Sequence, residues 1–82
     1  MKVYILNYFY GDDVIHTQTV YKTFDAAREA MLADVQCVEE ELLDTGEKRF
    51  ERYTGVAEAY ISAHERAALH RWEICEAKFI DK

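Results

Sequence analysis

The chain has 82 residues, a net charge of −6 at pH 7, and a composition that is 50% hydrophobic and 32% charged. This length supports one domain with one small core, and this balance of residues is typical of a globular protein rather than a disordered one. No apolar run is long enough to span a membrane, and the tyrosine-rich start lacks a signal-peptide cleavage site, so we expect a single cytoplasmic domain over residues 1–82.

Two strands are predicted at the start of the chain. Residues 2–10 are almost continuously apolar and rich in β-branched and aromatic side chains, which favours a strand in the middle of a sheet. Gly11 and the two aspartates after it predict a tight hairpin to a second strand over residues 14–21. One face of the first strand would carry Val3, Ile5 and Phe9 around Asn7, and the other would carry Tyr4, Leu6, Tyr8 and Tyr10.

Residues 23–46 have the clearest pattern in the sequence. Their apolar residues recur at steps of three and four, within an arc of about 80° on an ideal helical wheel. Thr23 precedes the pattern as a suitable N-cap, and Gly46 follows it and can adopt the left-handed conformation that ends many helices. The sequence therefore predicts one long amphipathic helix, with a stripe made of Phe24, Ala27, Met31, Val35, Val38 and Leu42.

The same segment carries the negative charge of the protein. From Asp25 to Glu47 there are eight acidic residues and one basic residue, Arg28, which gives −7 against −6 for the whole chain. Several acids crowd the C-terminal end, where the helix dipole disfavours them. The charge either forms a solvated face that maintains solubility or is placed for a basic partner. The candidate partner-binding acids are Glu39, Glu40, Asp44 and Glu47.

The second half of the chain leaves an alternative open. The structure of residues 47–53 is not indicated by their pattern. Residues 56–63 fit a strand, but they fit equally well the start of an alanine-rich helix that continues to residue 69, and propensity alone favours the helix. Residues 70–80 alternate in a way that predicts a final strand.

Several short motifs bear on this alternative. They are Lys-Val-Tyr-Ile at residues 2–5, Asp25-Ala26-Ala27, Ala59-Tyr60-Ile61 and Trp72-Glu73-Ile74-Cys75-Glu76. Together they resemble small phage and mobile-element accessory proteins, which are ββαββ domains ending in a strand with tryptophan or tyrosine, then glutamate and isoleucine. The resemblance implies a strand over 57–63. We therefore expect an α+β domain of ββαββ type, with one helix on a small antiparallel sheet; the alternative is ββααβ, with 56–69 helical.

The sequence offers little for catalysis. It has no glycine-rich phosphate loop, no nucleophile elbow and no metal-ligand spacing, and His16, His64 and His70 are far apart in sequence. We expect no enzyme activity, no catalytic residues, no metal and no cofactor. The acidic balance disfavours direct binding to nucleic acid. Cys37 and Cys75 are too few for a disulfide scaffold and are expected to be free thiols.

The remaining lead is a protein-binding surface. One helix covers only one face of a sheet, so the other face would expose either the tyrosine set or the set around Asn7. Tyrosine suits interfaces, and Tyr4, Tyr8 and Tyr10 are candidate partner contacts, or contacts of a homodimer.

Some proteins that the chain resembles are anti-CRISPR or other anti-defence inhibitors. They share no site motif, so no residue role is carried over. We expect a small acidic protein-binding inhibitor of that type, which occupies a basic surface of a nucleic-acid-binding host protein such as a CRISPR effector, in the host cytoplasm if it is encoded by a phage. The alternative is a homodimeric structural or accessory domain with no inhibitory role.

Overall fold

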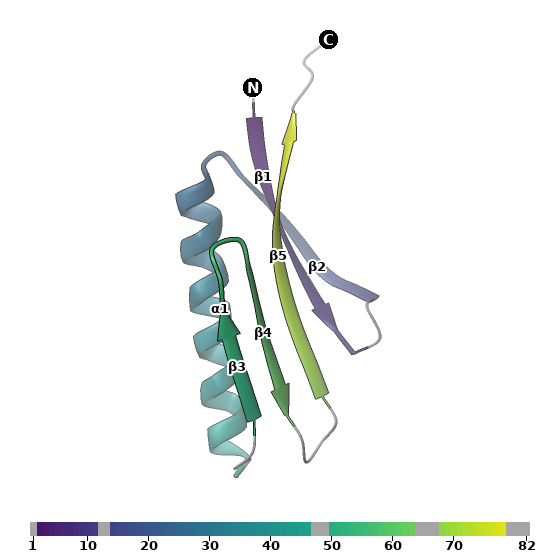
Figure 1. The fold of residues 1–82 in the computed structure, drawn as a ribbon, viewed down its shortest axis with the longest axis vertical. Coiled ribbons are helices and arrows are strands. Elements are labelled where there is room, and N and C mark those ends of the chain that lie inside the picture. The colour runs from purple at the N-terminus through teal and green to yellow at the C-terminus, as the bar shows by residue number, and fades with distance from the viewer. Residues whose placement is uncertain (1, 12–13, 47–49, 64–67, 79–82) are drawn as a thin grey trace.

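The computed structural model describes residues 2–11, 14–46, 50–63 and 68–78. One five-stranded antiparallel sheet, ordered β2-β1-β5-β4-β3, carries one helix on one of its faces (Figure 1). The elements in chain order are β1 (Lys2–Tyr10), β2 (Val14–Tyr21), α1 (Phe24–Asp44), β3 (Phe50–Thr54), β4 (Glu58–Ala63) and β5 (Ala68–Lys78). The expected α+β class is confirmed, and β1 lies inside the sheet as predicted.

The predicted ββαββ order is wrong by one strand, because three strands follow the helix rather than two. The additional strand is β3, which lies at the edge of the sheet and, among the described strands, pairs only with β4. An edge strand needs no continuous apolar run. In β3 two adjacent charged residues, Glu51 and Arg52, interrupt the alternation of apolar and polar residues that would indicate a strand. Residues 47–49, which belong to the segment of unclear structure, lie outside the described residues.

The ββααβ alternative is wrong over β4, where the alanine-rich segment is a strand. Ala59 and Ile61 are 1% and 0% exposed, and β4 pairs with β3 on one side and β5 on the other. Burial in the sheet thus overrides a helix propensity of only a few tenths of a kcal/mol per residue, on the order given by host–guest scales. The last strand begins at Ala68, two residues earlier than predicted. Residues 64–67 and 79–80 lie outside the described residues.

The long helix forms as predicted. The hydroxyl of Thr23 accepts a hydrogen bond from the backbone N–H of Ala26 at 3.1 Å, and Gly46 has a φ of 83°. Four residues of the predicted stripe are buried, namely Ala27, Met31, Val35 and Leu42. The core joins this stripe to the sheet and consists of Leu6, Met31, Val35, Leu42, Ala59, Ile61 and Trp72.

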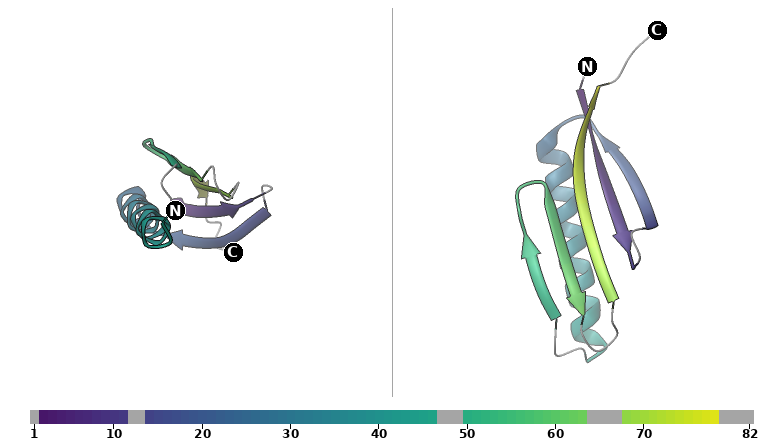
Figure 2. Two further views of the ribbon diagram at one scale, coloured as in Figure 1. Left: turned by 90° about the horizontal axis from the view of Figure 1, so that it is seen from below. Right: turned by 45° about the vertical axis from the view of Figure 1, so that its right-hand side comes forward.

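The structure decides which face of β1 meets the helix. The ring of Tyr4 packs edge-on against Phe24 with centroids 5.9 Å apart, and Tyr8 stacks on Trp72 at 5.2 Å. The tyrosine face therefore lies on the helix side of the sheet, and the face that includes Val3 and Ile5 is turned away. Figure 2 shows α1 end-on, on one side of the curved sheet, and no other described helix or strand covers the opposite side.

Candidate protein-binding surfaces

The solvent-exposed carboxylates of α1 form an acidic surface. The apolar stripe fixes which side of the helix packs on the sheet, so the carboxylates outside the stripe face solvent. All of them except Glu39 are exposed along the length of the helix. We define the acidic surface as Asp25, Glu29, Asp34, Glu40, Glu41 and Asp44.

The described arginines near this surface have partners outside it. Arg28, the single base on α1, donates to the carbonyls of Val56 at 3.1 Å and Gly55 at 3.3 Å, which ties the helix to the turn between β3 and β4. Arg52 on β3 forms an ion pair with Glu39. Among the residues that the structure describes, no other cation lies within 4.0 Å of a carboxylate of α1.

The predicted acidic contacts thus fall into separate groups. Glu40 and Asp44 belong to the acidic surface, and Glu40 also accepts a hydrogen bond from Gln36. The Glu39 side chain is only 27% exposed and is held by its arginine partner. Glu47 lies outside the described residues. The acidic surface also includes Asp34 and Glu41, which the sequence did not single out as contacts.

The predicted tyrosine contacts lie on the helix side of the sheet. Tyr4 and Tyr8 are partly buried there, whereas Tyr10 at the end of β1 is 50% exposed. Tyr8 and Tyr10 belong to an aromatic cluster with His70 and Trp72 of β5. The Tyr8 hydroxyl lies 2.5 Å from Nδ1 of His70, and the Tyr10 and His70 rings are 4.8 Å apart.

The environment of this cluster favours the neutral forms of Tyr8 and His70. Burial raises the pKa of Tyr8 to about 12, with further increases from Tyr10 and the carboxylates of Asp34 and Glu41. Burial lowers the pKa of His70, and the charge of Glu41 opposes this change. With the imidazole proton on Nε2, the Tyr8 hydroxyl donates its hydrogen bond to Nδ1.

The lowered pKa of His70 predicts a pH dependence of stability. Because the unfolded chain binds this proton near the ordinary value of about 6.5, His70 should cost the folded state stability as the pH falls below that value. The groups facing the imidazole are Tyr8, Tyr10, Trp72 and Glu41. We expect His70→Gln to lose less stability than the parent between about pH 7 and about pH 5.5, measured by urea unfolding. Equal losses in the two proteins would contradict this.

The sheet face turned away from α1, which we call the open face, is mixed in character. Its apolar members are interrupted by charged ones, so it is not a continuous hydrophobic patch. Arg71 lies over the ring of Phe9 at 4.4 Å, and the Tyr53 and Tyr60 rings are 5.5 Å apart. The residues that define it are Val3, Ile5, Asn7, Phe9, Gln18, Val20, Glu51, Tyr53, Glu58, Tyr60, Ser62, Leu69, Arg71, Glu73, Cys75 and Ala77.

Asn7 lies on the β1 part of the open face and is only 8% exposed. Its side-chain oxygen accepts a hydrogen bond from Gln18 at 2.9 Å, and its amide nitrogen lies 3.7 Å from the sulfur of Cys75. These contacts join three strands through one polar residue. The sequence analysis missed Tyr53 and Tyr60 as surface aromatics, although alternation along β4, where Ala59 and Ile61 are buried, could have placed Tyr60 on the opposite face.

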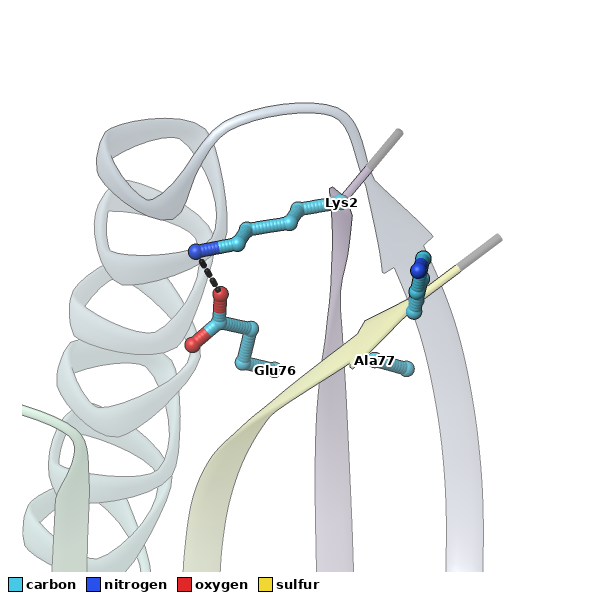
Figure 3. A pocket seen from close by; sticks show the side chains of 4 residues that line it. Lys2, Glu76 and Ala77 are labelled. Atoms are coloured by element: carbon cyan, nitrogen blue, oxygen red, sulfur yellow. Dashed lines mark ion pairs between the residues drawn. The ribbon is translucent and has the colours of Figure 1, made fainter. Parts of the chain in front are cut away.

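A hollow of about 480 Å³ lies beside the ends of β1 and β5. Its lining residues are Lys2, Glu76, Ala77 and Lys78 (Figure 3). Lys2 extends toward Glu76, and their charged groups form an ion pair at 2.9 Å. Their side chains are 71% and 50% exposed. Ligand pockets usually enclose their ligand in apolar walls with a few convergent polar groups, and this exposed hollow lacks that character.

The two cysteines lie on opposite sides of the sheet. Cys37 is exposed on α1, and Cys75 is exposed on the open face. Within the described residues, no three histidine, cysteine or acidic side chains are grouped to hold a metal ion.

We expect a thiol titration of the unfolded protein without reductant to find two reactive groups per chain. The reason is that the sheet separates the two cysteines and prevents a bridge between them. A count below two, or stoichiometric zinc by elemental analysis, would contradict this.

Comparisons of the chain with protein-family models, with curated proteins and with solved structures found no match. No helix in the described part of the chain is long and apolar enough to cross a membrane. The structure thus defines a small α+β domain with two kinds of accessible surface, one acidic and helical, the other a mixed sheet face.

Proposed function

We propose that this protein is a small acidic inhibitor that binds the basic surface of a nucleic-acid-binding protein through α1. The proposed target class includes CRISPR effectors, which would make the protein an anti-CRISPR or other anti-defence factor of phage or mobile-element origin. One observation supports this most strongly: six exposed carboxylates follow one helix without a described cation beside them.

The dimensions of the acidic surface suit this role. A helix of 21 residues is about 32 Å long, which is about the length of nine base pairs of duplex. Lysine and arginine side chains that hold phosphates also form charge-assisted hydrogen bonds with carboxylates. A row of carboxylates can therefore compete with nucleic acid for the same basic groove, and its field accelerates association.

The aromatic cluster supplies a second feature beside the acidic surface. Tyr10 is half exposed, and Glu41 acts electrostatically on the neighbouring Tyr8 and His70. An arginine of the partner could stack on an aromatic ring while pairing with a carboxylate, which is a frequent combination at interface hot spots. Tyr10 is therefore the predicted tyrosine that we retain as a partner contact.

The test is an inhibition assay on a panel of purified CRISPR nucleases. The protein is added in equimolar amount either before or after the guide RNA and target DNA, and cleavage is measured. We expect at least one nuclease to be inhibited when the protein is added first, and to be protected when nucleic acid is already bound. If no nuclease in the panel is inhibited in either order, the proposed target class is wrong.

A homodimeric structural domain is the second candidate. It is favoured by the apolar side chains that the open face exposes, since Val20, Tyr53 and Tyr60 are 59%, 43% and 37% exposed. On this alternative the acidic residues of α1 only maintain solubility. The protein would then inhibit no nuclease, and its binding to basic proteins would not depend on the position of its carboxylates.

A further inference from the structure

The two edges of the sheet differ in a way that bears on self-association. An edge strand presents unpaired backbone N–H and C=O groups, and proteins usually block it with charged residues, proline or a short strand. β3 is blocked in this manner, because it carries Glu51 and Arg52. β2 forms the opposite edge of the sheet (Figure 2, right).

β2 lacks blocking charges and proline. It has eight residues, Val14–Tyr21, without aspartate, glutamate, lysine, arginine, proline or glycine. It pairs only with β1, and no other described strand pairs with its outer edge. The register shift at Tyr8 and Phe9 leaves His16 as an extra residue, a bulge in the first half of β2, and the segment from Thr17 to Tyr21 pairs regularly with β1. Its side chains at Thr17, Gln18, Thr19 and Val20 are exposed.

From these features we infer that β2 is a pairing edge for a second copy of this chain. Antiparallel pairing of β2 with itself about a twofold axis would join the two sheets into one of ten strands. A second copy suits this edge because the strand has no fixed charge, so symmetry brings no like charges together even though each chain carries −6. The inference rests on β2 alone and does not depend on the acidic surface.

The geometry of the pair has a consequence for α1. Two antiparallel strands in one sheet are related by an axis perpendicular to the sheet, so both helices lie on the same face of the joined sheet. The dimer therefore presents two acidic helices side by side on one face and two open faces on the other. A partner that binds α1 would find two copies of it in the dimer. If the basic surface of the partner spans both helices, the apparent affinity of the partner for the dimer rises.

The first test is the mass in solution. Light scattering of the full chain at micromolar concentration should give about twice the chain mass of 9.6 kDa. Val20→Lys places a lysine of each copy near the axis on the same face, and like charges across strands oppose pairing. We expect it to weaken the dimer by about tenfold or more.

The matched control is Val56→Lys. Val56 is an exposed valine in the turn between β3 and β4, 71% exposed against 59% for Val20, so the two variants have the same net charge and differ only in position. Val56→Lys should dimerise as the parent does. Tyr60→Lys separates edge pairing from packing of the open faces, because Tyr60 lies on β4 away from the edge.

Hydrogen exchange gives a direct readout of the edge. In the dimer, consecutive amides of Thr17–Tyr21 should all be protected, whereas in Val20→Lys every second amide should exchange rapidly because it no longer has a partner. A parent that is monomeric across the micromolar range would overturn the inference. A dimer that Tyr60→Lys dissociates and Val20→Lys does not would also overturn it, since the contact would then be the open face.

Discussion

Replacing Trp72 with alanine is expected to destabilise the protein by about 3–5 kcal/mol, the largest effect of any single truncation that we predict. Trp72 is fully buried and is the largest such side chain in the core. It stacks on Tyr8 at 5.2 Å and lies opposite Ala59 in the register of β4 and β5. Ala59 is small and leaves room for the indole of Trp72. Removing the indole therefore opens a cavity that the neighbouring strands cannot fill.

The measurement is urea unfolding of the parent and of Trp72→Ala. The loss is large because small domains have total stabilities of about 5–15 kcal/mol. Trp72→Phe should lose less, because a ring still packs against Tyr8. Tyr53→Ala is the control for loss of an exposed aromatic, since Tyr53 is 43% exposed. A loss from Trp72→Ala no larger than that from Tyr53→Ala would show that this tryptophan is not the centre of the core.

Reversing two charges of the acidic surface is expected to weaken binding to a basic partner by tenfold or more, on the order found when charged contacts are lost from steered complexes. The variant is Glu40→Lys with Asp44→Lys. Both residues are exposed and lie off the apolar stripe, so the fold should persist. Asp44→Lys should raise stability slightly, by about 0.3–1 kcal/mol, because a cation suits the last turn of a helix.

The matched control reverses Glu51 and Glu58 to lysine. It produces the same net charge but alters the open face instead of α1. The comparison is made with an inhibited nuclease from the panel, by measuring association and dissociation rates of the parent and both variants. The acidic-surface variant should associate more slowly, and the control should associate nearly as the parent does. Equal association rates in the two variants would show that the carboxylates of α1 act only through the net charge of the protein.

Local patterns predicted the helix and the position of β1 inside the sheet. The helix is readable because its period and its caps at Thr23 and Gly46 are encoded within consecutive residues. β3 and β4 were not readable in this way. The strand state of β4 depends on burial between two other strands, and that of β3 depends on pairing with β4, so both are set by tertiary contacts that propensity does not contain.

The candidate site was predictable to the same extent. The negative charge of α1 can be read from consecutive residues, and Glu40 and Asp44 are exposed as their positions on an ideal helical wheel indicate. The pairing of Glu39 with Arg52 depends on where β3 lies and could not be anticipated. The choice of face for the tyrosines of β1 required knowing which side the helix covers, because both faces of that strand are apolar.

The most direct test of the proposed function is competition between this protein and nucleic acid for one basic surface. The apparent Kd of the protein for an inhibited nuclease is measured at increasing concentrations of guide RNA or target DNA and at two salt concentrations. We predict that the apparent Kd rises in proportion to the nucleic acid and that binding weakens at the higher salt, because both ligands need the same cations. An apparent Kd that is independent of nucleic acid and of salt would contradict the account.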